Sequence, residues 1–496
     1  MSERTAIEVT LDGPPTPAWQ ARALSGLRES ENLEVAAVRL LGARRRRPLR
    51  ALTRAVECHV FRIADPLVPV AVDPAEATGA QPSAVLWLSE RPPPACDDRE
   101  LLRLRHNGAP GTSADAFARA ALCTTAVVET ELLAVRGTDT FCIARTVSGV
   151  RAYSPTLSHA LALWKLAALV PRELGRAELS PAPADPDRES PSSPSPRRMF
   201  LRLVAAICRV AVVRTLYRRS WRIRVRARAD VPTQGWEHRE KLVDWGDAEL
   251  YADPFLIEHD GRHHLFCEEV RARAPGMISH TELARDGSPA RPPRCVMRAP
   301  HHLSYPFVFA HEGDIFMIPE TVALRRLELY RAVDFPTRWE REAVLLDDLT
   351  IADATIVAHD GRLWLFASVA APNASLLDEL HVYWASEPAG PWQPHARNPV
   401  VSDVRCARPA GAIQRWDGRL VRPGQDGSRR YGGAITFREI ERLTTTEYAE
   451  REIDRIDPDA VVDARATHSY ASDVRFEAID LRRRELRLRR RRSSRR

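Results

Sequence analysis

A repeated unit in the C-terminal half constrains the fold of this 496-residue chain more than any other feature. The units begin at residues 251, 304, 351 and 408 and read YADPFLIEHDGRHHLFCEE, SYPFVFAHEGDIFMIPET, IADATIVAHDGRLWLFAS and RPAGAIQRWDGRLVRPGQD. In each unit an acidic residue followed by glycine separates two apolar runs. Because glycine readily supplies the positive φ that a tight turn requires, this pattern predicts one β-hairpin in each unit.

The rest of each unit predicts further strands. The segments LELYRAVDFPTRWEREAVLL (327–346) and LHVYWASEPAGPWQPHARNPV (380–400) match each other and supply two outer strands each. Four strands per unit are typical of a β-propeller blade, whereas a parallel β-helix has shorter repeats. A diverged fifth unit, YGGAITFREI from 431 with SYASDVRFEAID from 469, predicts five blades over residues 218–480. Trp339 and Trp392 recur at matching positions, which favours packing between blades over ligand contact.

Acidic residues at corresponding positions of the units form the candidate site. The first strand of each propeller blade lines the axis, so residues at the heads of the units converge there. The heads are Asp253, Tyr305, Asp353 and Ala410, and the far ends of the hairpins carry Glu268 or Glu269, Glu320, and Gln425 with Asp426. We predict Asp253, Asp353 and Glu320 as catalytic and Glu268, Tyr305 and Gln425 as substrate-binding residues.

Clustered carboxylates suit glycosidic bond chemistry, in which one acts as base or nucleophile and another, with a raised pKa, donates a proton. The alternative is that acidic residues at the blade heads cap neighbouring backbone N–H groups, and it stays open at this point. If the carboxylates only repel one another, Asp253→Asn is expected to impair ligand engagement and leave stability unchanged.

The ADPF head, the hairpin turn, the LYRAxxFPxxW segment and GPWxxHxxNPV resemble the five-bladed propeller of glycoside hydrolases of the arabinanase and β-xylosidase type. They resemble more closely the propeller module of plant glucosamine inositolphosphorylceramide transferases and related bacterial proteins, over about residues 218–475. The resemblance implies glycan or glycolipid processing by hydrolysis or transfer, with Asp253 as base. The hydrolases order their carboxylates Asp, Asp, Glu, whereas this chain has Asp253, Glu320, Asp353, so the acid falls on Glu320 or Glu268. A non-catalytic carbohydrate-binding or scaffold module in cell-envelope glycan synthesis is the alternative.

The first 175 residues show an α/β pattern, with strands predicted at 7–11, 33–41 and 84–89 and helices at 19–27 and 158–174. LRLRHNGAPG (101–110) resembles the degenerate His-Gly loop of Rossmann-like formyltransferase domains. Asn107 follows His106 directly, so the Asn-x-His arrangement of that family is missing, and Asp139 is its acidic residue by position only. We therefore expect a degenerate formyltransferase-like domain with His106 in a loop. Formyl transfer to an amino sugar is a further alternative.

Three segments join or end these domains. Residues 176–198 are dense in Pro, Ser and charge, which predicts a disordered linker between separately folding domains. Residues 199–217 predict an amphipathic helix, and Arg202, Arg209 and Arg214 make a membrane-spanning helix unfavourable. We expect this helix to pack into a core, with a surface position as the alternative. Residues 481–496, with ten arginines, predict a disordered tail or a contact with an anionic membrane.

Several partners and cofactors are not expected. The arginine clusters lack interleaved aromatic residues, so specific nucleic-acid binding has no support. The eight cysteines form no CxxC pair, and the sequence holds no Gly-rich phosphate loop, so we predict no metal and no cofactor. The N-terminus lacks the pattern of a signal peptide. These features predict a cytoplasmic protein, peripheral at the inner membrane face if the tail binds lipid, with carbohydrate or glycolipid as its partner.

Overall fold

The computed structural model describes residues 4–42, 57–59, 62–74, 78, 80–89, 91, 93, 99–111, 114–123, 126–176, 182–184, 195–236, 241–243 and 248–486. The chain divides into two compact units, residues 1–208 with 371–375 and residues 209–370 with 376–496, and each is described by itself. Most of the predicted linker and the arginine-rich tail after Leu486 lie outside the described residues. The expected separate folding of the domains stays a prediction.

The N-terminal unit is built on one mixed sheet with strand order β10-β9-β8-β6-β5-β1-β3, and β7 pairs with β6. Its elements are β1 (Thr5–Asp12), β2 (Thr16–Pro17), α1 (Ala18–Arg28), β3 (Leu33–Leu41), β4 (Pro69–Val70), β5 (Ala84–Trp87), β6 (Glu100–His106), β7 (Ala109–Pro110), α3 (Ala114–Cys123), β8 (Val127–Arg136), β9 (Asp139–Gly149), α4 (Pro155–Leu174) and β10 (Ala182–Pro183). The predicted strands and helices of this region are present.

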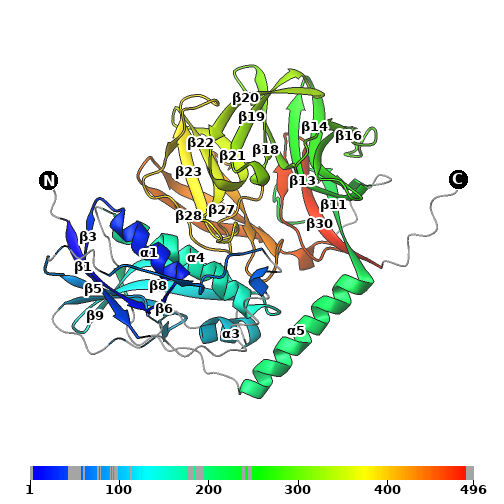
Figure 1. Cartoon of the computed structure of the whole chain (residues 1–496). Helices are drawn as coiled ribbons and strands as arrows, with labels where there is room; N and C mark the ends of the chain where they lie inside the picture. The colour runs from blue at the N-terminus through cyan, green and yellow to red at the C-terminus, as the bar shows by residue number, and fades with distance from the viewer. Residues whose placement is uncertain are drawn as a thin grey trace. The chain divides into compact units, whose positions relative to one another are not determined.

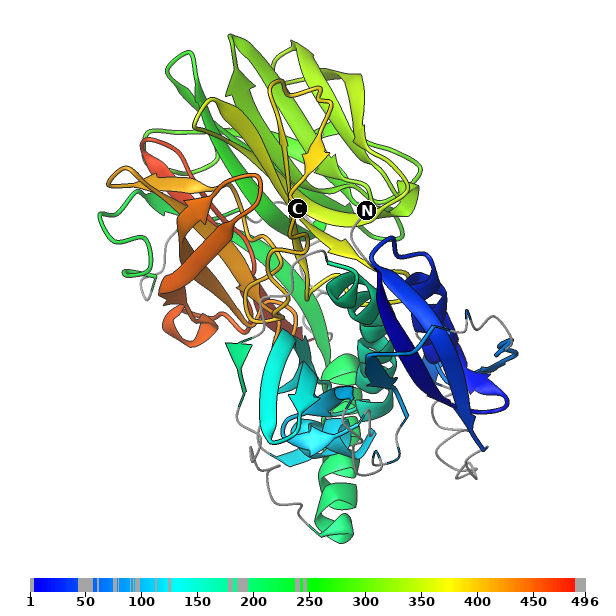
Figure 2. The same cartoon turned by 90° about the vertical axis from the view of Figure 1, so that its left-hand side faces the viewer.

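The sheet is parallel at one side and antiparallel at the other. β1 pairs in parallel with both β3 and β5, and β5 with β6, whereas β8 and β9 run antiparallel. Figure 2 shows β1 and β3, in dark blue, side by side. α1 and α4 share one apolar core with the sheet, in which Trp19 of α1 and Leu166 of α4 are buried. The likeness to formyltransferases stays a prediction.

His106 is not in a loop, as the sequence suggested, but ends strand β6 and is fully buried. Its Nδ1 atom lies 2.7 Å from the Thr130 hydroxyl. Burial, with the nearby His159, lowers the pKa of His106 to about 3. Asp139 is not its partner, because Asp139 pairs with Arg136 on β8 while His106 pairs with Thr130, which lies roughly 20 Å further along that strand.

The second unit holds five four-stranded sheets, which are the blades of a β-propeller (Figure 1). The first four are consecutive: β13 (Ala248–His259), β14 (Arg262–Arg271), β15 (Met277–Leu283) and β16 (Arg294–Met297); β17 (Ser304–His311), β18 (Asp314–Glu320), β19 (Leu327–Asp334) and β20 (Arg338–Leu346); β21 (Thr350–His359), β22 (Arg362–Ala370), β23 (Leu380–Ala385) and β24 (Gln393–Pro394); β25 (Gln414–Trp416), β26 (Arg419–Asp426), β27 (Ala434–Leu443) and β28 (Tyr448–Ile456). Short 3₁₀ turns lie at Val322–Leu324 and Pro458–Ala460.

The fifth blade joins the two ends of the propeller. It comprises β29 (Tyr470–Ser472), β30 (Phe476–Leu486), β11 (Tyr217–Ala227) and β12 (Lys241–Val243), in the order β12-β11-β30-β29. The predicted count of five blades is confirmed. The assignment of residues 431–440 to the fifth unit is wrong, because β27 is the third strand of the fourth blade. Two outer strands of the last blade instead come from before the first repeat, and this pairing joins the two ends of the propeller to close the ring.

The hairpin turns follow the sequence signal. Each acidic residue and the glycine after it have positive φ, from Asp260 (51°) and Gly261 (71°) in the first blade to Asp417 (49°) and Gly418 (79°) in the fourth. Two successive positive φ values define the turn whose twist matches a β-hairpin. Trp339 packs its ring 5.8 Å from Phe266 of the preceding blade, which confirms its predicted role between blades.

α5 (Pro196–Leu216) leads directly into β11. The expectation that this helix packs into a core is wrong, because its apolar side chains include Phe200 and Leu201, which are 65% and 66% exposed. Among the described residues, the structure contains no helix that is both long and apolar enough to span a membrane. Arginines interrupt the apolar run of α5 and account for this result.

Candidate functional site

The heads of the first three repeat units share one unusual backbone conformation. Asp253, Tyr305 and Asp353 have φ values of 51°, 45° and 53°. Each lies at an irregularity in the pairing of its hairpin, between the bulged positions of β13, β17 and β21. Left-handed φ is costly for residues other than glycine, and such bulges redirect side chains next to functional sites. The repeat therefore places three equivalent side chains at the inner strands of three blades.

Asp253 connects three blades through its carboxylate. Its Oδ1 atom lies 3.1 Å from His468 Nε2 and accepts a hydrogen bond from the Ser469 hydroxyl at 2.8 Å. Its Oδ2 atom accepts the backbone N–H of Tyr305 at 3.2 Å. His468 and Ser469 directly precede β29 of the fifth blade, and Tyr305 is on the second. Asp253 is thus a buried junction of blades one, two and five.

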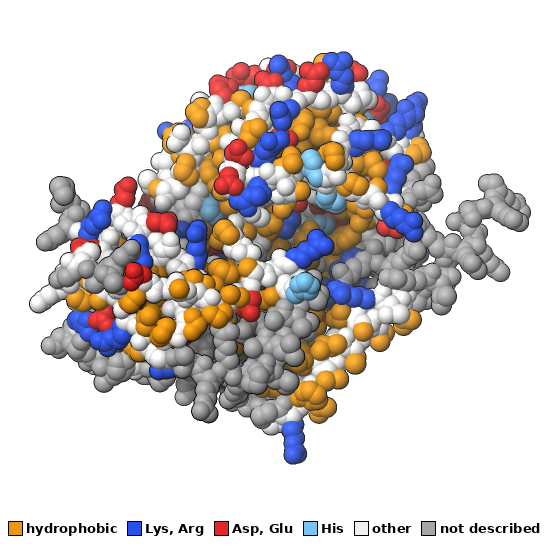
Figure 3. Space-filling view, in the orientation of Figure 1, with side chains coloured by type: hydrophobic (Ala, Val, Ile, Leu, Met, Phe, Trp, Pro, Cys, Tyr) orange, Lys and Arg blue, Asp and Glu red, His pale blue; other side chains and the backbone are white. Residues whose placement is uncertain are grey.

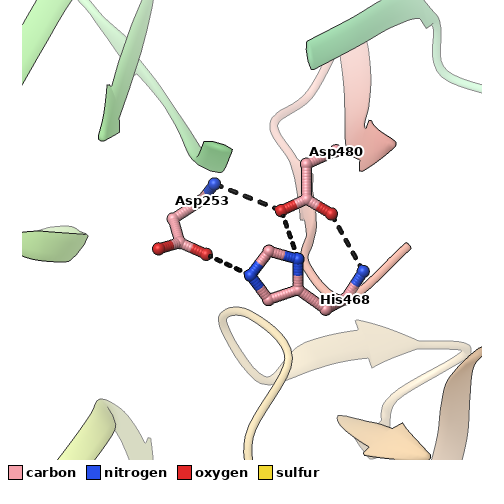
Figure 4. A group of neighbouring side chains, drawn as sticks. All are labelled: Asp253, His468 and Asp480. Atoms are coloured by element: carbon pink, nitrogen blue, oxygen red, sulfur yellow. Dashed lines mark hydrogen bonds and ion pairs between the residues drawn. The ribbon is translucent and has the colours of Figure 1, made fainter. Parts of the chain in front are cut away.

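His468 lies between two carboxylates (Figure 4). Its Nδ1 atom is 2.7 Å from Asp480 Oδ2, opposite the contact with Asp253. Asp480 also accepts the backbone N–H groups of His468 and Ser469 at 2.9 and 3.1 Å. Burial lowers the pKa of His468, but the charges of Asp480 and Asp253 outweigh it and raise this pKa to about 10. His468 is therefore a buried imidazolium at neutral pH.

The pKa of Asp253 shifts in the opposite direction from those of ordinary buried acids. Burial acts to raise it, but the charge of His468 and the hydrogen bonds from His468 and Ser469 prevail and hold the pKa of Asp253 below its usual value. Asp253 is consequently an anion over the whole neutral range.

Glu268 faces the same cluster from strand β14, and its Oε1 atom lies 2.9 Å from His302 Nε2. Burial, with the charge of Asp253, raises the pKa of Glu268. The neighbouring Glu269 points to the opposite face of the strand, where it accepts a hydrogen bond from Ser279 at 2.6 Å and pairs with Arg271. Of the two glutamates that the sequence left open, Glu268 is the one near Asp253.

Asp353 is held by a second group of side chains. Arg408 binds it in a bidentate manner, with Nε 2.5 Å from Oδ2 and Nη2 3.1 Å from Oδ1. Gln425 Nε2 donates to Oδ2 at 2.9 Å and to the Pro409 carbonyl at 2.8 Å. Asp426, next to Gln425, instead pairs with Arg455 at 3.0 Å. Asp353 is therefore already neutralised by an arginine from the fourth blade.

Glu320, at the end of β18, completes the second group. Its Oε2 atom lies 3.4 Å from Arg408 Nη2. Burial, with the charge of Asp353 and a hydrogen bond to it, raises the pKa of Glu320 well above its ordinary value, and Asp253 adds to this effect. Glu320 thus favours the protonated form in the same cluster in which Asp253 is anionic.

Tyr305, predicted to bind substrate, makes contacts within the protein. Its hydroxyl accepts the backbone N–H of Gly411 at 2.7 Å, and its ring packs edge-on against Phe255 at 4.9 Å. Only 1% of Tyr305 is exposed. In this structure Tyr305 joins the second blade to the segment before the fourth.

Asp253, His468 and Asp480 each offer a ligand atom within 4.8 Å of the others, which is compatible in spacing with a metal ion. Both imidazole nitrogens, however, already face carboxylate oxygens at hydrogen-bond distance. A metal-bound histidine must present a nitrogen lone pair, and a protonated one cannot. The donor set therefore fits a salt-bridged imidazolium better than a metal centre.

Sequence reasoning missed the basic half of this cluster. Arg408 is the first residue of the fourth unit, and His468 stands one residue before the quoted segment of the fifth, so both were within view. Asp480 was missed because β30 was not recognised as the partner of β29 and β11. Tyr431 was also missed, and its ring lies 4.8 Å from that of His468 and 5.6 Å from the Arg408 guanidinium. The repeated acidic residues can be recognised in the sequence, but their basic partners lie at positions that do not recur from one repeat unit to the next.

The fold and site define a five-bladed β-propeller in which one set of buried carboxylates lies against the His468 imidazolium and a second set lies against the Arg408 guanidinium. The profile of the family described as glucosamine inositolphosphorylceramide transferase 1, N-terminal, matches residues 244–482 of this chain.

Curated relatives agree with that match. The chain is 37% identical over 206 residues to glucosamine inositolphosphorylceramide transferase 1 of Arabidopsis thaliana, which covers 41% of this chain and 27% of the plant protein. It is 34% identical over 233 residues to the protein of the same name from Oryza sativa subsp. japonica, with 46% and 31% covered. The chain thus spans about a third or less of the length of these relatives.

Among solved structures, the chain is similar to Zg3597, a family 117 glycoside hydrolase of Zobellia galactanivorans, with a TM-score of 0.33, 12% identity, and 46% of this chain and 84% of that one covered. It is also similar to the α-L-arabinanase of Cellvibrio cellulosa in complex with arabinohexaose, with a TM-score of 0.31, 18% identity, and 40% and 77% covered.

Proposed function

We propose that this protein processes a glycan or glycolipid at the centre of its propeller, by hydrolysis or transfer at a glycosidic bond. One observation carries the proposal: the carboxyl groups of a single buried cluster have pKa values displaced in opposite directions. The pKa of Asp253 is lowered, whereas those of Glu320 and Glu268 are raised. Such a division separates a base from an acid at one pH.

The roles follow from these protonation states. Asp253 is the base or nucleophile, because His468 keeps it ionised. Glu320 or Glu268 is the proton donor, because burial keeps each of them protonated to a higher pH than usual. Asp353 and Arg408 adjust the donor, since both lie against Glu320 and contribute opposite charges to it. The similarity to glucosamine inositolphosphorylceramide transferases supports a carbohydrate or glycolipid as the substrate class.

Gln425 supports the binding of a polar ligand at the same place. It is 1% exposed, and among the described residues no hydrogen-bond donor reaches its Oε1 atom. A buried acceptor without a donor is costly, and a sugar hydroxyl is a suitable partner for it. Tyr431, which is 39% exposed beside Arg408, offers an aromatic face of the kind on which sugar rings stack.

The test compares four variants with the wild type on a panel of 4-nitrophenyl glycosides and on a glycan array. Asp253→Asn, Glu320→Gln and Glu268→Gln each remove one charge and keep the size of the side chain. Asp260→Asn is the matched control, because Asp260 is 87% exposed in the turn that follows Asp253 in the same hairpin. We expect turnover to fall at least a hundredfold in Asp253→Asn and in one of the two glutamate variants, on the order of what a general acid or base contributes.

Glu320→Gln keeps this test decisive, because that variant is expected to fold even if Asp253→Asn does not. Unchanged turnover and unchanged glycan binding in both Glu320→Gln and Glu268→Gln would overturn the proposal.

The second candidate is carbohydrate binding without turnover, as in a scaffold for glycan synthesis. It is favoured by the pairing of Asp353, which Arg408 and Gln425 saturate so that it is not available as a reacting group. For this function we expect glycan binding that Glu320→Gln alters, with no release of nitrophenol from any glycoside of the panel.

A further inference from the structure

Helix α5 presents a large apolar surface to solvent. Its side chains Phe200, Leu201, Val204, Ile207, Val212 and Leu216 are all exposed, and Cys208 and Ala211 lie among them. Figure 3 shows patches of orange hydrophobic surface among white along the helix at the lower right. A contiguous exposed apolar surface on a folded protein marks a contact with a partner or a membrane.

The exposed apolar residues other than Leu216 occupy one side of α5. At about 100° per residue, the positions from Ile207 through Phe200 and Val204 to Val212 span roughly 140° of the helix circumference. A separate stripe, formed by Leu203, Ala206, Val210 and Val213, is half-buried. The helix thus has one half-buried apolar stripe and another apolar face that is exposed to solvent.

Arginines border the exposed apolar face on both sides. Arg198, Arg202 and Arg209 fall within about 40° of one another along one edge of the face, and Arg214 lies at the other edge. All four are exposed. No acidic residue occurs between residues 190 and 229, so the helix and its flanking sequence carry a net positive charge. Long arginine side chains beside an apolar face reach polar headgroups while the face enters the acyl region.

The fifth blade of the propeller meets the C-terminal end of the helix. Tyr217, which directly follows α5, pairs with Leu486 at the end of β30. The fifth blade therefore returns the chain to the helix, and Figure 1 shows β11 and β30 side by side where α5 ends.

We infer that α5 is an interfacial anchor that lies in the headgroup region of an anionic phospholipid bilayer, with its exposed apolar face toward the acyl chains. The helix is about 31 Å long, but its arginines exclude a spanning orientation and favour one parallel to the surface. The arginines that border the apolar face, in a stretch of sequence without acidic residues, select a negatively charged membrane rather than a neutral one.

The experiment uses the full chain and vesicles of phosphatidylcholine with or without phosphatidylglycerol. An environment-sensitive fluorophore on Cys208, which lies within the exposed apolar face, reports insertion. We expect wild-type protein to float with the anionic vesicles and the emission to shift to the blue. Labelled Cys208→Ser protein should show no shift, which controls for reaction at other cysteines.

Variants separate insertion from simple charge attraction. Phe200→Ser/Leu201→Ser should weaken binding at least about tenfold, as expected for loss of two apolar contacts. Arg198→Gln/Arg209→Gln should weaken binding to anionic vesicles and reduce its salt dependence. Val474→Ser, at a 74% exposed position on the propeller, is the matched control and should bind as the wild type does. A chain ending at Leu486 should still give the blue shift.

Three results would overturn the inference. The first is no binding of the wild type to anionic vesicles. The second is binding that the Phe200→Ser/Leu201→Ser variant retains in full and that a chain ending at Leu486 loses, which assigns binding to the tail alone. The third is a dimer in sedimentation that Phe200→Ser/Leu201→Ser converts to a monomer, which assigns the apolar face to a second copy of the chain.

Discussion

The Nε2 atom of His468 lies 3.1 Å from the Oδ1 atom of Asp253. A side chain just before β29, the inner strand of the fifth blade, therefore pairs with Asp253 of the first blade. The ring is thereby closed twice, by the pairing of β11 with β30 at its outer part and by this ion pair at its centre. Because the pair is buried, removal of one partner leaves the other as an uncompensated buried charge.

The first prediction concerns Asp253→Asn. Loss of the charge leaves His468 with one carboxylate in a buried setting, so the free energy of unfolding should fall by about 3 kcal/mol. The measurement is urea denaturation at pH 7, with Asp260→Asn as the control that should not change. This expectation replaces the one from sequence, which considered repulsion between carboxylates and not the imidazolium. An unchanged free energy of unfolding in Asp253→Asn would contradict the buried ion pair.

The second prediction concerns the pH dependence of stability. The folded-state pKa of His468, about 10, is above its unfolded value of 6.5. Its contribution is therefore fully present below pH 6.5 and is lost as the pH rises through about 10. Denaturation midpoints should fall more steeply over this interval in the wild type than in His468→Gln, and the difference between the two curves isolates the contribution of His468. Parallel curves for the two proteins would show that His468 is not charged.

The third prediction concerns Glu320→Gln. The folded-state pKa of Glu320 is raised, so the folded protein binds a proton that the unfolded chain has released above its ordinary pKa of 4.5. Stability therefore falls as the pH rises from 4.5 toward the raised pKa. Glu320→Gln removes this cost and should be more stable than the wild type at pH 8 and closer to it at pH 4. Thermal melts at both values measure the difference, and a lower melting temperature at pH 8 would contradict the raised pKa.

The fourth prediction concerns Arg408→Gln. Without the guanidinium, Asp353 is a buried carboxylate that has lost its bound cation, so stability should fall by about 3 to 5 kcal/mol. The double variant Arg408→Gln/Asp353→Asn should recover much of this loss, since no charge is then left unpaired. Arg419→Gln, at a half-exposed position of the same blade, is the control. Additive losses in the double variant would mean that Arg408 and Asp353 do not interact.

Much of the propeller follows from local sequence. The acidic residue and glycine of each unit specify a hairpin with positive φ, and an apolar alternation on both sides specifies its strands. These signals are short-range, so four blades and their hairpins were predictable, and equal spacing placed Asp253, Tyr305 and Asp353 in register. The same matching positions in the repeat units predicted Asp253 and Asp353 as site residues.

The fifth blade and the counterions depended on tertiary structure. β11 and β30 are separated by more than two hundred residues, and β11 lies outside the repeated units, so only ring closure brings them together. His468, Asp480 and Arg408 likewise acquire their meaning from partners on other blades. A sequence shows which side chains carry charge, but the sign of a pKa shift depends on burial and on neighbours that long-range contacts supply.

The same division applies to α5. Its sequence determined a helix that is apolar, basic and unable to span a membrane, because arginine is unfavourable at the centre of a bilayer. Whether the apolar side chains of α5 enter a core or stay exposed depends on whether other elements of the fold pack against them. The main cores of the propeller and of the mixed sheet are formed by other residues. The sequence by itself therefore determined the elements and their repeats, and the tertiary structure decided which charges are paired and which apolar surface is left uncovered.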